Sequence, residues 1–208
     1  MFMKIGVIIS MYDEYDNVTR NIQNINKNSF PIIVVQSDPK DSDKIIDSNL
    51  VNYYKKFPDM MGTGNIFTDD ATKAICHPLS RNLSHAFKTA NSFDVNWWIV
   101  LFGDVELYNF NGIMKIINKM NSQNKSLGIT REIGLTCTNK FGMPGKVEKF
   151  NSHNFVPTFF IINSKLIKKG IFQDIEVTNP FAMEECIGDA ATKFFKENNY
   201  DFFEQSYI

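Results

Sequence analysis

The sequence has no apolar run of the roughly 18 to 20 residues that a helix needs to cross a bilayer. Its start, residues 1–10, is apolar but short, and it carries neither a basic leading segment nor a small-residue cleavage site. We therefore interpret it as a first strand and not as a signal peptide. No block rich in Lys and Arg occurs, and the formal net charge is −1, which argues against a nucleic-acid partner.

Cysteine is scarce, with three residues at positions 76, 137 and 186. Their number is odd, they are widely separated, and no C-x-x-C pattern occurs. This pattern favours reduced thiols in a cytosol-like compartment, so the expected location is cytoplasmic. Each cysteine is expected to be a small, buried apolar side chain.

The apolar content is high, because 43% of the 208 residues are hydrophobic. That is enough to bury the core of one domain, and no repeat, low-complexity tract or linker divides the chain. Apolar runs typical of strands alternate with segments of helical periodicity. The expected strands cover about 4–10, 32–35, 50–54, 97–102, 126–130, 133–138 and 156–162, with Phe202-Phe203 as a further candidate. The expected helices cover about 14–27, 41–47, 70–91 (with a possible interruption at Pro78), 110–120, 164–170 and 181–197. The alternation predicts an α/β fold with one open, mostly parallel sheet flanked by helices.

Polar side chains follow the expected strands at their carboxyl ends, where open α/β sheets bind ligands. They are Ser10, Tyr12 and Glu14 after the first strand, Asp38 after the second, and Asp104 and Glu106 after the strand at 97–102. Together they supply an aromatic ring, a hydroxyl and several carboxylates. A nucleotide needs such groups for its base and ribose.

Asp104 and Glu106 are two residues apart, and in an extended segment this spacing puts both carboxylates on the same side. Two hard oxygen ligands suit Mg²⁺ or Mn²⁺, which usually share their coordination with substrate phosphates. The alternative is that Gly103-Asp104 forms a turn and that Glu106 is a solvated charge. The acidic pair by itself does not decide between these interpretations.

Arg81 stands in the segment Ser80-Arg81-Asn82-Leu83, which opens a helical stretch leading into the strand at 97–102. The guanidinium offers five fixed donors, which suit a diphosphate or a carboxylate. An ordinary ion pair between Arg81 and an acid such as Asp104 is the alternative.

Arg81-Asn82, a helix with Ala86 and Ala90, and an apolar strand ending in an acidic pair resemble the centre of the glycosyltransferase A fold. The resemblance is greatest to the family 2-like nucleotide-sugar glycosyltransferases. That family ends the strand with Asp-x-Asp, whereas this sequence has Asp104-Val105-Glu106. The resemblance implies a single domain over 1–208, with a nucleotide-binding half over about 1–106 and an acceptor-side half over about 107–208.

The resemblance also implies roles for individual residues on the donor side. Ser10, Tyr12 and Glu14 would contact the nucleoside, Glu14 (or Asp13) standing where the family has Asn. Asp38 would contact the base or ribose, and Arg81 and Asp104 would contact the diphosphate.

The metal and the general base are implied in the same way. Asp104 and Glu106 would hold Mn²⁺ or Mg²⁺, with His153 as a third ligand. Glu185, or alternatively Glu184, would be the general base of an inverting reaction. Both acids also suit the N-terminal end of a helix dipole. If neither is a base, a retaining mechanism is the alternative.

The implied reaction moves a sugar from a nucleoside-diphosphate sugar, with UDP favoured, to a hydroxyl of a glycan or another acceptor, as in glycan or surface-polysaccharide synthesis. A sugar-phosphate nucleotidyltransferase is an alternative, but the turn at 11–14 is acidic and lacks the glycines of a phosphate loop. A non-catalytic nucleotide-sugar-binding module is a second alternative, because Asp-x-Glu departs from the family motif.

Overall fold

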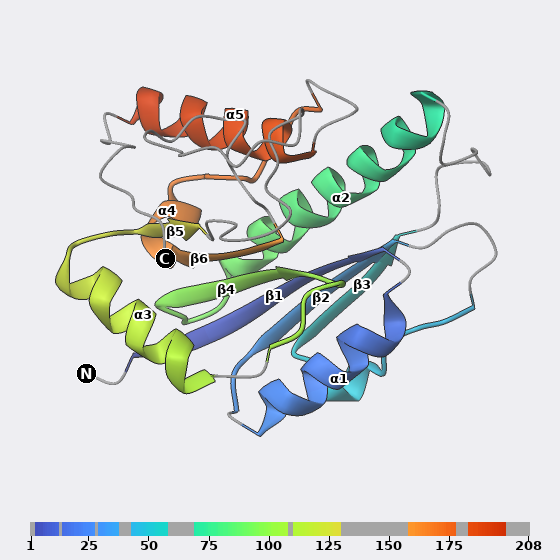
Figure 1. Ribbon diagram of the computed structural model, residues 1–208, viewed down its shortest axis with the longest axis horizontal. Helices are drawn as coiled ribbons and strands as arrows, with labels where there is room; N and C mark the ends of the chain where they lie inside the picture. Colours follow the sequence, from blue (N-terminus) through green and yellow to red (C-terminus); the bar gives the residue numbers. More distant parts are fainter. Residues whose placement is uncertain are drawn as a thin grey trace, which may run out of the picture.

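A six-stranded sheet organises the chain, with the strand order β3-β2-β1-β4-β6-β5 (Figure 1). The strands are β1 (Ile5–Tyr12), β2 (Ile32–Ser37), β3 (Tyr53–Phe57), β4 (Trp97–Phe102), β5 (Leu127–Ile129) and β6 (Phe159–Asn163). The helices are α1 (Tyr15–Asn26), the 3₁₀ turn η1 (Ser48–Leu50), α2 (Asp69–Ala90), α3 (Phe110–Ser122), α4 (Ser164–Lys168) and α5 (Met183–Glu197). This computed structural model describes residues 3–12, 14–27, 29–37, 43–57, 69–107, 110–129, 158–177 and 183–198, apart from the side chains of 69–77, 129 and 183–185.

Strands β1 to β4 run parallel to one another, and β6 runs antiparallel to both β4 and β5. The predicted open, mostly parallel sheet is therefore confirmed. All six residues of β2 and all six of β4 are buried. Burial on both faces explains why these strands are continuous apolar runs and do not alternate with polar residues.

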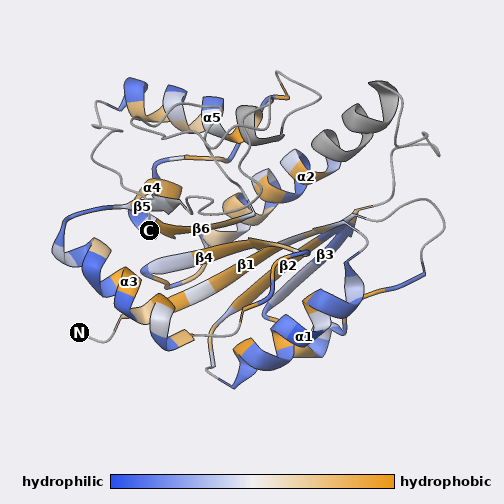
Figure 2. Cartoon of the chain, in the orientation of Figure 1, coloured by the Kyte–Doolittle hydropathy of each residue, from blue (hydrophilic) through white to orange (hydrophobic). Residues whose placement is uncertain are grey.

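Helices cover both faces of the sheet (Figure 1). Apolar residues of α2, α4 and α5 form one core with the sheet, and those of α1 and α3 form the other. In Figure 2 the helices show both hydrophilic and hydrophobic residues, as expected when each buries one side. None of the described helices combines the length and apolarity that spanning a bilayer requires.

The chain reverses its winding between β1 and β4. It runs outward through β1, α1, β2 and β3, and then returns to β4 through α2 on the other face. The carboxyl ends of β1 and β4 therefore lie on either side of a topological switch point, where open α/β sheets bind their ligands.

Two local expectations differ from the structure. The helix expected over 41–47 is wrong for 43–47, which has no regular structure; Ile46 is buried there while Ile45 is 59% exposed. One buried apolar side chain does not offset the cost of starting a short helix. The interruption considered at Pro78 is also wrong, because Pro78 lies inside α2.

Other expectations hold or lie outside the described residues. The strand expected near 50–54 is found three residues later, at β3. The strands expected at 133–138 and at Phe202-Phe203 lie outside the described part of the chain. Cys186 is a buried free thiol as expected, whereas Cys137 and the side chain of Cys76 are not described.

We expect Gly6→Ala to destabilise the fold by about 1–3 kcal/mol, as overpacking a core does. Gly6 of β1 pairs in register with Trp98 of β4, and an added Cβ would lie 2.5 Å from the Trp98 ring. Urea unfolding measures the loss. The cost should shrink when Trp98→Leu is introduced first, because the ring that causes the clash is gone. An equal cost in both backgrounds would contradict this explanation.

Candidate functional site

The carboxyl ends of the parallel strands lie level with one another. Tyr12 of β1 is paired in register with Ser37 of β2, which in turn is paired with Phe57 of β3. On the other side of β1, Ser10 is paired with Phe102, the last residue of β4. Hydroxyl groups, aromatic rings and the start of the loop after β4 therefore share one edge of the sheet.

Asn82 of α2 connects the ends of β1 and β2 through buried hydrogen bonds. Its Oδ1 accepts a hydrogen bond from the Ser37 hydroxyl at 2.8 Å, and its Nδ2 donates to the backbone carbonyl of Met11 at 3.2 Å. Asn82 and Ser37 are both almost fully buried. A buried amide that lost these partners would cost free energy, so the two bonds set where α2 crosses the ends of β1 and β2.

Arg81, the neighbour of Asn82, is held at the same edge but is only partly buried. Its Nη2 donates to the Ser37 hydroxyl at 2.9 Å. Its guanidinium carbon lies 4.3 Å from the centre of the Phe57 ring, which is a cation–π contact. The Ser37 hydroxyl and the Phe57 ring therefore help to fix the direction of this cation.

His85, one turn further along α2, also contacts Phe57. The two rings meet edge to face with centres 5.2 Å apart, and His85 Nε2 lies 2.6 Å from the Tyr53 hydroxyl. Burial lowers the pKa of His85, and the nearby ammonium groups of Lys55 and Lys88 lower it further. The neutral ring can accept a hydrogen bond from Tyr53 through Nε2.

The loop after β4 begins with a tight turn. Val105 N donates to Phe102 O at 3.1 Å, and Gly103 N donates to Ser10 O at 3.0 Å. A Cβ on Gly103 would lie 2.6 Å from the Cβ of Glu14, so glycine permits this close approach of the two loops. The segment after Phe102 is therefore a turn and not the extended strand that the spacing argument for Asp104 and Glu106 assumed.

The two acids of the Asp-x-Glu motif have different surroundings. Asp104 is exposed, and it forms no ion pair with Arg81 or any other residue that the structure describes. Glu106 pairs with Arg20 of α1, and its Oε1 lies 2.8 Å from Nη2 and 3.2 Å from Nε. Across the described residues, no three His, Cys, Asp or Glu side chains gather as a metal site.

Five of the residues proposed from the sequence meet at this edge. They are Ser10, Tyr12, Glu14, Arg81 and Asp104. Ser10 is fully buried and its hydroxyl has no hydrogen-bond partner among the described residues. Asp38 and His153 lie outside the described residues. Glu184 and Glu185 lie in the first turn of α5, but their side chains are not described.

Sequence reasoning did not assign a role to Ser37 or to the buried amide of Asn82. Ser37 was visible as the last residue of a strand, which places it at the ligand-binding edge. Its link to Asn82 spans 45 residues, and no local pattern indicates such a contact.

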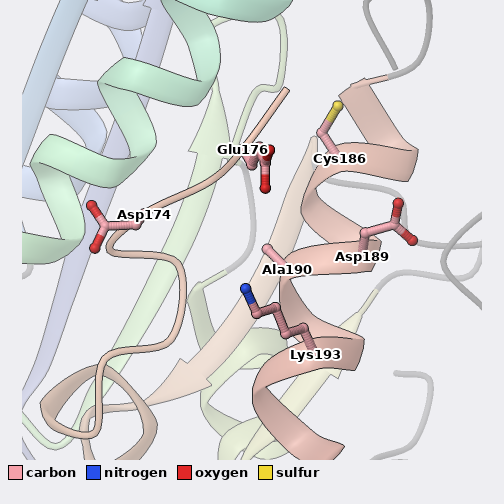
Figure 3. Close-up of a pocket in the computed structure, with 6 residues that line it drawn as sticks. All are labelled: Asp174, Glu176, Cys186, Asp189, Ala190 and Lys193. Carbon is pink, nitrogen blue, oxygen red and sulfur yellow. The ribbon is translucent and has the colours of Figure 1, made fainter. Parts of the chain in front are cut away.

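Two cavities lie away from this edge. One, of about 180 Å³, separates α5 from the segment that carries Asp174 and Glu176 (Figure 3). Lys193 reaches from α5 toward that segment, whereas Asp189 points away from it (Figure 3). The other, of about 380 Å³, lies at the amino ends of β1 and β4 beside Lys165 and Lys168. Neither is lined by a residue of the strand-end site.

We expect acidification to destabilise the protein through His85. The pKa of His85 is lowered in the folded state, so His85 of the unfolded chain takes up a proton first as the pH falls below 6.5. Protonation then favours the unfolded chain, and stability that is present above this pH is lost. Thermal unfolding between about pH 7.5 and pH 5.5 measures this loss. His85→Gln, which retains hydrogen-bonding groups but does not titrate, should lose less stability over this range; an equal loss in both proteins would contradict the assignment.

No protein-family model matches the chain, and no curated protein matches it. Solved structures do resemble it. Mannosyltransferase PcManGT from Pyrobaculum calidifontis, in complex with GDP-Man and Mn²⁺, aligns with a TM-score of 0.50 and 11% identity over 93% of this chain and 52% of its own. TarS residues 1–349 from S. aureus align with a TM-score of 0.47 and 16% identity over 89% and 55%.

A third similar structure is 4-diphosphocytidyl-2C-methyl-D-erythritol synthase from Anaerococcus prevotii, with a TM-score of 0.46 and 11% identity over 99% of this chain and 88% of its own. This chain spans about half the length of the mannosyltransferase and of the TarS fragment. At these identities the likeness concerns the fold alone. The strand order and the match to the mannosyltransferase agree that the chain has the glycosyltransferase A fold expected from its sequence.

Proposed function

We propose that this chain is a glycosyltransferase that moves a sugar from a nucleoside-diphosphate sugar to an acceptor hydroxyl. The observation that carries the proposal is the guanidinium of Arg81, which is fixed at the carboxyl ends of β2 and β3, on the same edge of the sheet as the topological switch point. It is held by Ser37 and Phe57 at the same edge as the exposed carboxylate of Asp104, which has no ion-pair partner among the described residues. A cation held at this place suits the diphosphate of a donor, since ligands of such sheets bind there.

The leaving nucleoside diphosphate gains negative charge as the bond to the sugar breaks. The Arg81 guanidinium is a planar, permanently charged group whose donors match the oxygens of a diphosphate. Those directed to the diphosphate would stabilise the developing charge without having to reorient. Ser10, Tyr12, Glu14 and Asp38 are proposed to line the nucleoside side of the donor, as their positions at or after the carboxyl ends of β1 and β2 suggest.

Asp104 fits the Mn²⁺ or Mg²⁺ that the family resemblance implies. It is an exposed carboxylate with no ion-pair partner among the described residues, and such oxygen ligands bind divalent cations together with substrate phosphates. The ion would neutralise charge on the diphosphate. Support comes from the fold shared with a mannosyltransferase whose structure contains GDP-Man and Mn²⁺. His153 remains a proposed further ligand of the ion, whereas Glu106 pairs with Arg20.

The acceptor hydroxyl needs a base that takes its proton during attack on the sugar. Glu185, with Glu184 as the alternative, is the proposed base of an inverting reaction, and both acids lie in the first turn of α5. The acceptor is proposed to be a glycan or another hydroxyl compound, and the donor a UDP-sugar in preference to other nucleotides.

Donor binding should raise the melting temperature of the protein, because a ligand that binds only the folded state stabilises it. UDP-, GDP- and dTDP-sugars are each tested with and without Mn²⁺. Arg81→Lys should weaken the binding by about tenfold or more, because Lys cannot replace the planar set of donors. Lys119→Gln on α3 is the matched control. The proposal fails if no nucleotide sugar raises the melting temperature of the unaltered protein.

Asp104→Asn should reduce slow donor hydrolysis by at least about 100-fold, as expected when a group that neutralises the leaving diphosphate is lost. Release of nucleoside diphosphate measures the reaction. Glu197→Gln, an exposed acid at the end of α5, should retain the activity. Donor binding without hydrolysis would favour a binding module. Pyrophosphate release from a nucleoside triphosphate and a sugar phosphate would instead favour a nucleotidyltransferase.

A further inference from the structure

The loop after β4 is held by hydrogen bonds to α1, on the face of the sheet opposite α2. Asn21 of α1 is 1% exposed, and its Nδ2 donates to Val105 O at 2.5 Å while its Oδ1 accepts from Leu107 N at 2.9 Å. One amide thus satisfies backbone groups on both sides of Glu106. Because this amide forms hydrogen bonds to the backbone at Val105 and at Leu107, it fixes the backbone path of Glu106 between them.

Arg20, the neighbour of Asn21, holds the side chain of Glu106. Its Nη2 and Nε both donate to Oε1 of Glu106, and its Nη2 also donates to Asn17 one turn earlier on α1. The side chain of Glu106 is only 27% exposed. Glu106 is therefore bound to a cation on the α1 side of the sheet, while Arg81 of α2 lies on the other side.

The loop is fixed before Asp104 as well as after it. Gly103 is bonded to Ser10 O and lies against Glu14, and Leu107 is buried in the core that α1 and α3 form with the sheet. Asp104 is exposed between these two attachments. Its position follows from contacts made by its neighbours, since its own side chain has no partner among the described residues.

We propose that Arg20 and Asn21 are positioning residues for Asp104, and that Glu106 anchors the loop instead of serving as a second metal ligand. The part of this inference that concerns Asp104 rests on the proposed function. To bind a metal strongly, Glu106 would have to compete with the two donors of Arg20 for its charge. The inference also accounts for Asp-x-Glu, because the longer side chain of Glu reaches Arg20 on α1.

A charge swap distinguishes an anchor from a metal ligand. We compare Arg20→Glu, Glu106→Arg and the double variant by titrating Mn²⁺ with the nucleotide sugar that gives the largest thermal shift, and by hydrogen exchange of the Leu107 amide. Each single change should weaken Mn²⁺ binding and speed the exchange, because like charges then face each other. The double variant should recover both properties to within about threefold, because the pair is restored with its signs reversed.

A metal-ligand role for Glu106 predicts a different result for the double variant. If Glu106 ligates the metal, an arginine at 106 cannot replace it, so the double variant would bind Mn²⁺ as weakly as Glu106→Arg even with exchange at Leu107 restored. Glu106→Gln should change Mn²⁺ affinity by less than about threefold for an anchor, since the amide oxygen still accepts from Arg20. A larger loss would again assign Glu106 to the metal.

Asn21 is tested by a variant of similar size that lacks the amide. Asn21→Leu should raise exchange at Leu107 by about tenfold or more, as loss of one hydrogen bond does, and should weaken Mn²⁺ binding. Asn21→Asp keeps the acceptor for Leu107 N, so its exchange rate at Leu107 should lie between those of the unaltered protein and Asn21→Leu. Unchanged exchange in Asn21→Leu would overturn the role of Asn21. If the unaltered protein binds no nucleotide sugar, the proposed function fails, while hydrogen exchange at Leu107 in the charge-swap variants still decides whether Arg20 and Glu106 are coupled.

Discussion

The buried amide of Asn82 is the interaction on which the candidate site depends. Its hydrogen bonds to Ser37 and to the carbonyl of Met11 join α2 to the ends of β2 and β1. Arg81 precedes it on the same helix, so the bond that places the helix also places the guanidinium beside Ser37 and Phe57. An apolar residue could fill this volume but could not fix the crossing point, because apolar contacts have no direction.

A second buried amide, that of Asn21, acts on the opposite face of the sheet. It holds the loop after β4 through Val105 and Leu107, as Asn82 holds α2. The cation and the carboxylate proposed to meet the donor diphosphate are thus each positioned by a neighbouring buried amide. Both amides are satisfied within the protein, which leaves Arg81 partly exposed and Asp104 exposed at the edge of the sheet.

The Asp-x-Glu motif gains a physical explanation from this arrangement. Asp104 lies within the turn Phe102–Val105, and Glu106, just after this turn, pairs with Arg20 of α1. Replacing Asp by Glu at the second position therefore need not be a weakened metal pair. In this explanation the two acids have different roles: Asp104 faces the solvent at the switch point, and Glu106 anchors the loop that carries Asp104.

The sequence by itself determined the sheet, because β2 and β4 are apolar runs buried on both faces, and it placed Asp104 directly after β4, at the edge formed by the carboxyl ends of the strands. It could not determine which acid binds a cation, nor that Ser37, Asn21 and Asn82 hold the site. Those features depend on hydrogen bonds between residues 45 to 86 positions apart. Local periodicity reports which side of an element is apolar, whereas only the folded chain decides which distant polar groups meet.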